Sequence, residues 1–310
     1  MIAGGCEVGE LELIEWVRRR IGPSKGVLIG PGDDAAALEF PPGEPVLATV
    51  DSVVDGVHFD LARHRPEEIG AKAIKVSLSD VAAMAGTPLY CLVEMGIPAG
   101  TDEAVLHGIF EGLKRAADRH STAVVGGNVV RSARLSVSTT LLGTVSRRRI
   151  ARRGGARPGQ SIFVTGDLGG SGLGKHISFE PRLREGKWLA ENCRLGAMID
   201  VSDGLSSDLH HVAAESGVGM ILEAAAVPIS PDALRAAEDD GRSPLEHALN
   251  DGEDYELLFT VDEGDAETLA KRAPFKTSRI GSVLRTGKGV FIRLADGREA
   301  ALERGGWKHL

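Results

Sequence analysis

Five short acidic segments, each set among glycines or small residues, recur along this chain. They are PGDDAA at 31–36, TVDSVVDGVHF at 49–59, LSDVAAMAG at 78–86, IDVSDGL at 199–205 and DGEDYELLF at 251–259. Carboxylates inside apolar, small-residue segments are costly to bury unless a positive charge accompanies them. A divalent metal ion is the partner that this pattern favours.

The ligand atoms that these segments offer are oxygens. Histidines and cysteines do not cluster with them, and carboxylate oxygens select hard, magnesium-type cations over zinc. Magnesium held by a few carboxylates usually bridges substrate phosphates. The pattern therefore predicts phosphoryl transfer from a nucleotide, which needs charge neutralisation and alignment more than a protein nucleophile. The sequence assigns no side chain as the catalytic group.

The first two segments are predicted to present aspartates from a turn and from a strand. In GPGDDAA, Gly30 and Gly32 permit a tight backbone path from which Asp33–Asp34 projects toward a cation, although a plain surface turn has the same composition. In VLATVDSVVDGVHF, a buried strand is predicted to end on Asp51, a rigid place for a ligand, while Asp55–Gly56 also fits a simple turn.

The later aspartates are predicted near helix and strand ends. Asp80 falls on a buried helix, where a helix cap or a solvent-facing side chain is the alternative. In IDVSDGLSSDL, Asp200 and Ser202 alternate at the end of a strand. Asp203 then begins the turn into a helix N-terminus, a natural place for phosphate.

Two other stretches have phosphate-binding features. The segment 169–176, GGSGLGKH, nearly matches GxxxxGK[ST], but His176 stands where a magnesium-binding hydroxyl is required, so a phosphate loop is not the favoured interpretation. The basic run from Arg147 to Arg157 is typical of a solvated connector. One or two of its guanidinium groups could nevertheless grip a phosphate.

The composition indicates a folded chain without nucleic-acid or membrane partners. Its 310 residues, 42% hydrophobic and 26% charged, are enough for two domains with cores. The formal net charge of -8 argues against nucleic-acid binding through bulk electrostatics. Three cysteines without CxxC spacing fit a reduced protein, and no apolar run approaches the roughly 20 residues of a membrane helix. We therefore expect a cytoplasmic protein with small-molecule ligands.

Periodicity predicts helices and strands in both halves, hence an α/β or mixed α+β fold. Helices are expected over 10–20, 67–85, 102–120, 205–216 and 265–272, and strands over 46–50, 89–95, 135–145, 161–165, 220–223 and 255–261, with closing strands near Ile280 and Phe291. Val124 and Val125 lead into a predicted Gly126–Gly127 turn. The basic, glycine-rich connector that begins at 147 divides the chain into predicted domains 1–146 and 147–310.

Taken in order, the acidic segments resemble the thiamine-monophosphate kinase family of the aminoimidazole-ribonucleotide-synthetase-like superfamily. The motifs that carry the resemblance are GDDAA, LSDVAAMAG, GGNVVRS, VTGDLG, DVSDGLSSDL and GEDYELLF, and they span nearly the whole chain. The resemblance implies a two-domain fold in which N-terminal strands form a barrel shared by the two subunits of a homodimer, and a C-terminal mixed sheet carries helices. It also implies magnesium-dependent, in-line transfer of the terminal phosphate of ATP onto thiamine monophosphate, giving thiamine diphosphate. The first domain would bind ATP and magnesium and form the dimer.

The resemblance also assigns site residues, motif by motif. Implied magnesium ligands are Asp34, Thr49, Val50, Asp51, Asp80, Asp200 and Asp203, with Thr49 and Val50 contributing main-chain or hydroxyl oxygen. Implied ATP contacts are Thr49, Gly127, Asn128, Arg153 and Ser202. Implied thiamine contacts are His58, Glu253 and Trp307. An aromatic ring at Trp307 suits a cationic thiazolium, which is attracted to an electron-rich face.

The sequence departs from the family pattern near the metal and nucleotide positions. GGNVVRS has Asn128 where the family's usual GGDTTRS has aspartate, and Val129 and Val130 replace hydroxyl side chains. An amide coordinates without charge, so one magnesium site should be weaker or absent. Val50 fills a place usually held by threonine, and the segment before Asp200 is shorter than in the family. A paralogue acting on a different small acceptor and a non-catalytic nucleotide-binding relative are the alternative functions.

Overall fold

The computed structural model describes residues 10–285 and 287–306, which divide into two compact units. Unit 1 contains the described residues up to Val81 together with Thr87–Arg147. Unit 2 contains Ala82–Gly86 and the described residues from Arg148 onward. Both units mix helices and strands, so the predicted α/β (α+β) fold class is confirmed.

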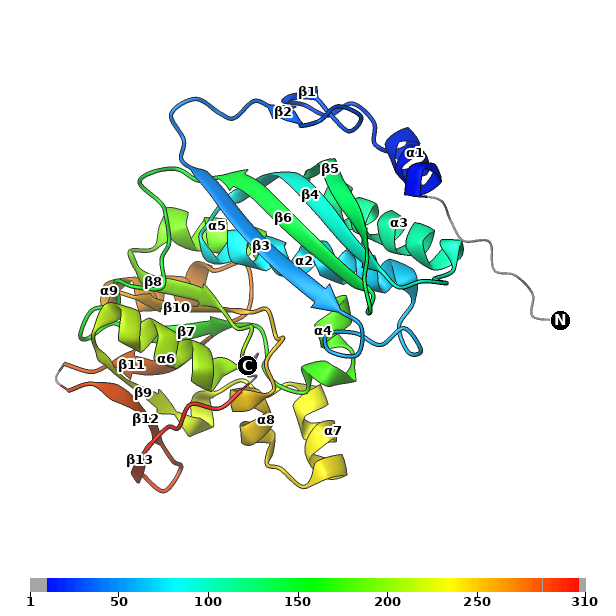
Figure 1. Cartoon of the computed structure of the whole chain (residues 1–310). Helices are drawn as coiled ribbons and strands as arrows, with labels where there is room; N and C mark the ends of the chain where they lie inside the picture. Colours follow the sequence, from blue (N-terminus) through cyan, green and yellow to red (C-terminus); the bar gives the residue numbers. More distant parts are fainter. Residues whose placement is uncertain (1–9, 286, 307–310) are drawn as a thin grey trace. The chain divides into compact units, whose positions relative to one another are not determined.

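Unit 1 is built on a four-stranded sheet with the order β3-β6-β4-β5. Its strands are β3 (Val46–Val54), β4 (Thr87–Ile97), β5 (Ala123–Arg131) and β6 (Ser136–Thr144). The β4–β5 pair is parallel and the other pairs are antiparallel. Helices α2 (Pro66–Ala83) and α3 (Glu103–Arg119) lie side by side on one face of this sheet (Figure 1). Helix α1 (Glu10–Arg20) and the strands β1 (Val27–Ile29) and β2 (Ala37–Leu38) precede the sheet in the chain.

The two faces of the unit 1 sheet differ in burial. On β6, Val137, Thr139 and Leu141 are buried, and Thr139 bonds to Ser77 and to the Ala73 carbonyl on α2. Because side chains alternate along a strand, the intervening residues point to the opposite face. On β3 these include Val50, whose side chain is 65% exposed. The sheet thus has a helix-covered face and an open face.

Unit 2 is built on a seven-stranded sheet with the order β13-β12-β9-β11-β7-β10-β8. Its strands are β7 (Ser161–Thr165), β8 (Leu195–Asp200), β9 (Gly219–Glu223), β10 (Leu257–Val261), β11 (Thr277–Val283), β12 (Gly289–Arg293) and β13 (Glu299–Ala301). Its α-helices are α4 (Lys175–Ser178), α5 (Leu183–Asn192), α6 (Leu205–Ser216), α7 (Pro231–Asp240), α8 (Pro244–Asn250) and α9 (Glu263–Arg272), with 3-10 turns η1 (Ser171–Leu173) and η2 (Ala224–Ala226). The β9–β12 pair is parallel, and the other pairs are antiparallel.

Side chains that alternate along the strands of the unit 2 sheet pack into two hydrophobic clusters, one on each face. Ile162, Val164 and Leu258 pack with Leu205 and Leu209 of α6 in one cluster. Their strand neighbours pack in the other, which contains Phe163, Leu189, Leu257, Phe259 and Leu269. The sheet therefore has a core on each face, with α6 on one and α5 and α9 on the other. This packing holds the end of β8 and the start of α6, and the predicted ligands Asp200 and Asp203 lie at the end of β8 and in the loop between the two elements.

Three predicted elements differ from the structure. Strand β3 runs past Asp51 to Val54, because its backbone pairs with β6 along its whole length. It is half-exposed rather than buried, because alternate side chains point to the open face of the sheet. The predicted Gly126–Gly127 turn is wrong: β5 continues through both glycines. A Cβ on Gly127 would lie 1.9 Å from the Val93 carbonyl oxygen, so this glycine serves close strand approach. Tyr255, predicted to begin a strand, has a left-handed backbone instead.

Other predicted elements agree with the structure. The bounds predicted for 10–20, 161–165 and 205–216 coincide with α1, β7 and α6, and the helix predicted over 102–120 is α3 with Asp102 and His120 as its caps. The helix predicted over 67–85 ends two residues earlier, at Ala83. Helices α5, α7 and α8 are additions that the periodicity did not reveal.

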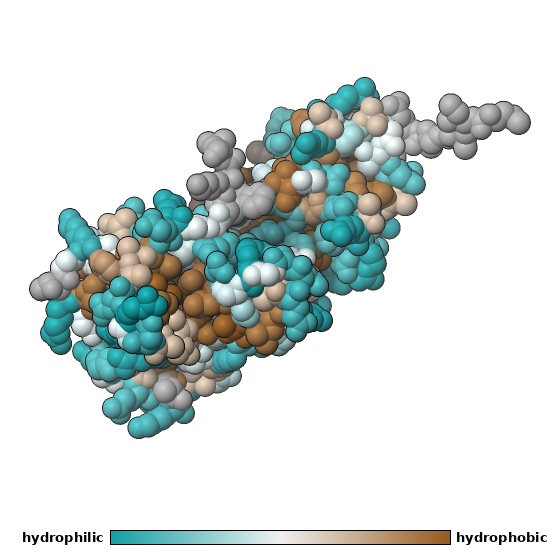
Figure 2. Space-filling model, turned by 90° about the horizontal axis from the view of Figure 1, so that it is seen from below, coloured by the Kyte–Doolittle hydropathy of each residue, from teal (hydrophilic) through white to brown (hydrophobic). Residues whose placement is uncertain are grey.

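The surface mixes hydrophilic and hydrophobic residues. On the face drawn in Figure 2, hydrophilic residues cover most of the surface and hydrophobic residues gather in patches. Within the described parts of the chain, none of the helices combines the length and the apolar character needed to cross a membrane.

Candidate functional site

Unit 1 contains a cavity of about 700 Å³ whose wall is partly apolar and partly charged. The apolar wall comes from α1 and α3, through Leu13, Ile14, Val17 and Phe110. The polar lining includes Arg18, Asp33, Asp34, Glu94, Gly127 and Asn128. Of the predicted site residues, the cavity thus brings together Asp34, Gly127, Asn128 and the side chain of Val50.

A polar row crosses the open face of the sheet along the cavity. Ser52 pairs in register with Ser138, Ser138 with Glu94, and Glu94 with Asn128. The two serine hydroxyls are 2.7 Å apart. Because registered residues on neighbouring strands share a face, the Glu94 carboxylate and the Asn128 amide are neighbours. Glu94 was missed from the sequence, although the alternation of LYCLVEM would have placed it on the same face as Leu92.

The loop that carries Asp34 is exposed and lies next to a cation. The amide of Asp34 donates to Asp33 Oδ1 at 2.9 Å. Gly32 has a φ of +124°, and a Cβ there would lie 2.3 Å from Arg18 Nη2. The loop therefore presents carboxylates beside a guanidinium group, a combination that suits a metal-bound anion.

Three predicted ligands share the helix-covered face of unit 1. Thr49 and Asp51 are two residues apart on β3 and therefore point to the same face. The Thr49 hydroxyl donates to the carboxylate of Asp80 on α2. Val50 points to the opposite face, so its side chain lines the cavity while Thr49 and Asp51 do not.

His58 follows β3 and is held through both its ring and its backbone carbonyl. The amide of Val54 donates to His58 Nδ1 at 3.2 Å, and Lys72, whose side chain is buried, donates to the His58 carbonyl at 2.7 Å. Because a backbone N–H can only donate, Nδ1 is an acceptor, and a neutral ring carries its proton on Nε2. The structure thereby fixes the tautomer of this predicted substrate residue.

In unit 2, the end of β8 lies against the segment that carries Glu253. The amide of Glu253 donates to Ser202 O at 2.7 Å, and the amide of Tyr255 donates to Val201 O at 2.8 Å. Gly252 makes this approach possible, since a Cβ there would be 2.8 Å from Ser202 O. The structure therefore brings the backbone of the predicted substrate residue Glu253 to that of the segment that bears Asp200, Ser202 and Asp203.

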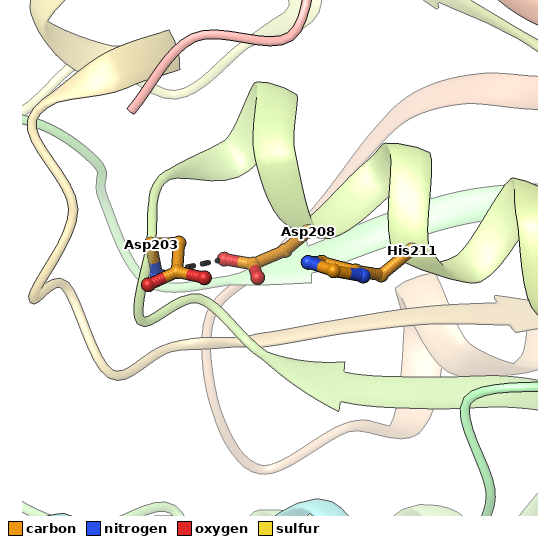
Figure 3. Close-up of side chains that lie close together, drawn as sticks. All are labelled: Asp203, Asp208 and His211. Atoms are coloured by element: carbon orange, nitrogen blue, oxygen red, sulfur yellow. Dashed lines mark hydrogen bonds between the residues drawn. The ribbon is translucent and has the colours of Figure 1, made fainter. Parts of the chain in front are cut away.

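Asp208 adds a buried carboxylate to this group (Figure 3). Asp208 lies at the start of α6, and its side chain turns back toward the preceding loop. Its Oδ2 accepts hydrogen bonds from the backbone amides of Ser202 at 3.1 Å and Asp203 at 3.2 Å. Burial raises the pKa of Asp208 well above its usual range, and the charges of Asp200 and Asp203 raise it further. A positive charge is needed to keep these carboxylates ionised together, which fits a divalent cation. Asp208 was missed, although DGLSSDL places it five residues after Asp203, in the first turn of the predicted helix.

His211 completes a cluster with Asp203 and Asp208, in which one potential ligand atom of each lies within 4.8 Å of the others (Figure 3). Arg304 Nη2 lies 2.6 Å from His211 Nε2 and can only donate, so Nε2 is an acceptor. Burial lowers the pKa of His211, and the charges of Arg304 and Arg153 lower it further. His211 is therefore a neutral ring committed to Arg304, and the carboxylates are the better metal ligands. The predicted ATP residue Arg153 is exposed and close enough to act on this ring.

The glycine-rich segment 169–176 contacts carboxylates. The amide of Gly169 donates to both oxygens of Asp254 at 3.0 Å, and the amide of Gly170 donates to Asp251 Oδ2 at 2.8 Å. Lys175 Nζ lies 3.0 Å from Glu256 Oε1. The backbone donors that a phosphate loop would use are thus occupied by the protein's own acidic side chains.

Trp307 lies outside the described residues. The residue before it, Gly306, packs against the Asp203 segment: a Cβ on Gly306 would lie 2.0 Å from Asp203 O. The amide of Gly305 donates to the Ser206 hydroxyl at 3.1 Å. The described end of the chain is therefore anchored on the loop that carries a predicted magnesium ligand.

Comparison with known proteins identifies the family. Residues 32–145 match the N-terminal domain of AIR synthase related proteins. The thiamine-monophosphate kinase of Rhodopirellula baltica is 38% identical over 288 residues, which cover 90% of each chain. The chain belongs to the thiamine-monophosphate kinase family.

Solved structures of this family have the same fold. The crystal structure of thiamine-monophosphate kinase from Stenotrophomonas maltophilia K279a aligns with a TM-score of 0.80 at 32% identity, covering 95% of this chain and 98% of that one. AaThiL complexed with AMPPCP and TMP aligns with a TM-score of 0.77 at 33% identity, covering 97% of each chain. The resemblance inferred from the motifs is thereby confirmed.

Proposed function

We propose that this protein transfers the terminal phosphate of ATP to thiamine monophosphate, producing thiamine diphosphate and ADP. The observation that carries the proposal is the hydrogen bond from the Glu253 amide to Ser202 O, within the segment that bears Asp200 and Asp203, in a chain of the thiamine-monophosphate kinase family. A family member solved with AMPPCP and TMP supports the choice of both substrates. The cavity of unit 1 is a suitable nucleotide site.

The proposed reaction is a direct in-line displacement. An oxygen of the thiamine monophosphate phosphate attacks the γ-phosphorus of ATP, the bond from that phosphorus to the β–γ bridging oxygen breaks, and ADP leaves with the bridging oxygen. No protein nucleophile is required, so the protein's part is to bind, align and neutralise charge. This agrees with a site rich in carboxylates.

Magnesium fits the residues that would hold it. In unit 2 the ligands are Asp200 and Asp203, whose charges contribute to the raised pKa of Asp208. In unit 1 we assign Asp34, Asp51, Asp80 and the oxygens of Thr49 and Val50. Bound magnesium would neutralise the phosphate charge that builds up during transfer.

The nucleotide contacts are assigned to residues that line the unit 1 cavity and to three residues outside it. Gly127 leaves backbone exposed in the cavity, Asn128 offers an amide, and the apolar wall of Leu13, Val17 and Phe110 suits a base. Thr49, Arg153 and Ser202 complete the assigned contacts. Glu94 supplies a carboxylate next to Asn128, where the family's usual aspartate would stand.

The acceptor contacts are assigned to His58, Glu253 and Trp307. His58 in its fixed tautomer offers an Nε2–H donor that suits a phosphate oxygen. Glu253 offers a carboxylate of charge opposite to thiazolium, and Trp307 offers an aromatic face. The anchoring of Gly306 against Asp203 supports an acceptor role for the C-terminal tryptophan.

We further propose a cytoplasmic homodimer formed by the first domain, residues 1–146. The open face of the unit 1 sheet exposes Val46 by 51%, Val50 by 65% and Val130 by 40%, and β3 is an edge strand. Apolar side chains exposed on this face, together with an edge strand, favour association with a second copy. The second domain, 147–310, supplies the remaining ligands.

The function is tested with the purified chain, ATP, magnesium and thiamine monophosphate. We expect thiamine diphosphate to form, measured by separating the thiamine phosphates, and Asp203→Ala to abolish turnover. Glu238→Ala, a change of the same charge on the surface helix α7, is the matched control and should leave turnover unchanged. ATP binding without thiamine diphosphate formation would favour the binding-protein alternative, and transfer to another acceptor would favour the paralogue.

A further inference from the structure

Two carboxylates lie buried within three residues of Glu253 in the sequence. Asp254 and Glu256 are each 1% exposed. Glu256 accepts two hydrogen bonds from Arg182, both at 2.7 Å, and a third from the Thr165 hydroxyl at 2.7 Å. Asp254 accepts the Gly169 amide. Buried carboxylates of this kind require hydrogen-bonding or cationic partners, because the loss of a partner leaves a buried charge uncompensated.

The residues that alternate with these carboxylates have a strained backbone. Glu253 and Tyr255 each have a φ of +51°. Left-handed backbone in a residue other than glycine is strained and persists where surrounding contacts enforce it. Tyr255 is held by stacking on Phe179, with ring centroids 3.9 Å apart, and its hydroxyl donates to Glu253 Oε1 at 3.2 Å. The conformation of Glu253 therefore depends on contacts that its neighbours make.

Lys175 is the cation shared by the two buried carboxylates. Its Nζ lies 3.0 Å from Glu256 Oε1 and 3.4 Å from Asp254 Oδ1, and it donates to the Asp167 carbonyl at 2.6 Å. Arg182 bonds to Glu256 and to Glu185. Loss of Lys175 would thus leave Glu256 paired with Arg182 but would remove an ammonium group from Asp254.

We propose that Lys175 is a positioning residue: by bridging the buried carboxylates of Asp254 and Glu256, it holds Glu253 in the conformation that binds the thiamine moiety. This inference rests on the proposed function. One peptide bond separates Asp254 from Glu253, and both flanking residues are left-handed, so a shift of Asp254 is passed directly to the Glu253 backbone. The glycine-rich segment 169–176, which contains Lys175, would then support binding of the thiamine moiety rather than bind a phosphate.

The electrostatics of the pair agree with this role. Burial raises the pKa of Asp254 to about 7, and the charge of Lys175 opposes that shift. Burial also opposes ionisation of Glu256, but hydrogen bonds from Arg182 and the charge of Lys175 bring its pKa below the usual value. Asp254 is thus the member of the pair that is more sensitive to the loss of Lys175.

The test is Lys175→Met, which keeps most of the side-chain length and removes the charge. A cavity of about 710 Å³ adjoins Lys175 and leaves room for the methionine. We expect the KM for thiamine monophosphate to rise about tenfold, the loss of one charge-assisted contact, with kcat and the KM for ATP nearly unchanged. Lys271→Met removes a lysine whose side chain is 76% exposed on α9 and should change none of these constants.

A rescue variant separates positioning from general damage. In Lys175→Met/Asp254→Asn, the neutral amide needs no cation, and its oxygen still accepts the Gly169 amide. We expect the KM for thiamine monophosphate to return toward the wild-type value. If the second substitution instead raises KM further, or if Lys175→Met changes kcat and both KM values alike, Lys175 does not act by positioning Glu253.

Amide hydrogen exchange provides a readout that is independent of turnover. The amides of Glu253 and Tyr255 are hydrogen-bonded to Ser202 and Val201, and they should exchange faster in Lys175→Met, while the amide of Phe163 on β7 should not. Unchanged exchange at Glu253 would overturn the inference even if the enzyme is active. Faster exchange in a protein without thiamine monophosphate kinase activity would support the positioning role and refute the proposed function.

Discussion

Asn128 and Glu94 are neighbours in register on two parallel strands, and both line the unit 1 cavity. The family's usual motif has an aspartate at the position of Asn128, so the chain lacks one negative charge there. Glu94 provides a carboxylate one strand away. In the proposed site, Glu94 therefore supplies a negative charge next to the position of Asn128.

This arrangement predicts the effect of moving the charge. Glu94→Gln should raise the magnesium concentration needed for half-maximal activity by about tenfold, because it removes the negative charge beside Asn128 and leaves two neutral amides there. Asn128→Asp alone should lower that concentration, and Glu94→Gln/Asn128→Asp should restore it to near the wild-type value. Identical magnesium titrations for all four proteins would show that this pair is not part of the metal site.

Asp254 predicts a pH dependence of stability. Its folded-state pKa of about 7 lies above the usual 3.8, so the folded state holds this proton more tightly than the unfolded state does. The resulting stabilisation is complete below the ordinary pKa and is lost as the pH rises through about 7. Thermal unfolding between about pH 6 and about pH 8 should show the melting temperature of the wild type falling relative to Asp254→Asn. A constant difference between the two proteins would contradict the assignment.

Much of the proposed site is assigned from the motifs, but some of it depends on tertiary packing. Asp34, Asp200 and Asp203 were recognisable because each stands in an acidic segment near a glycine. Asp208 and Lys175 were not, because the sequence does not show that a helical carboxylate turns back onto a loop or that a lysine meets two buried acids. Glu94 became significant only when the register of β4 and β5 placed it beside Asn128.

At the level of elements, β5 shows how a composition signal can mislead. A Gly-Gly pair usually indicates a turn, yet here β5 passes through it because the backbone of Gly127 lies against β4. The opposite case occurs at α8, where Ser243, Pro244 and Glu246 form a capping box that is visible in the sequence. Local capping chemistry could have predicted α8, whereas the β5 pairing is a long-range effect that the local sequence does not encode.

The two glycines of β5 provide a matched test of this interpretation. Gly127→Ala should lower the free energy of unfolding by about 3 kcal/mol, because its Cβ would collide with backbone. Gly126→Ala should cost about 1 kcal/mol or less, because its Cβ would lie 3.1 Å from the tip of the Leu92 side chain, which can move. Chemical denaturation measures both, and equal losses for the two variants would contradict the close approach of β5 to β4.

At the level of the whole molecule, the sequence was sufficient for the fold class and the family because the motifs occur in order over nearly the entire chain. The open face of the unit 1 sheet is a different matter. It is exposed because α2 and α3 pack on the other face of the sheet, whereas the sequence predicts a buried strand there. The structure thereby adds a reason for a dimer that periodicity alone did not provide.

The proposed dimer predicts a change of mass. Sedimentation of the wild type should give twice the mass of one chain. Val46→Lys should lower the measured mass toward that of a single chain, because a charge would be buried at the contact. Leu234→Lys on α7, where the native side chain is 52% exposed, is the control and should remain dimeric. A wild-type protein that sediments as a single chain would refute this quaternary proposal and leave the reaction chemistry to be judged separately.

The central claim is that the terminal phosphate of ATP passes directly to thiamine monophosphate. The most direct measurement is a single turnover with γ-³²P-labelled ATP, magnesium and thiamine monophosphate, followed by separation of nucleotides, thiamine phosphates and protein. The account predicts that the label leaves ATP and appears in thiamine diphosphate, with one ADP formed per thiamine diphosphate and no label on the protein. Label found in inorganic phosphate without thiamine diphosphate, or bound to the protein, would contradict it.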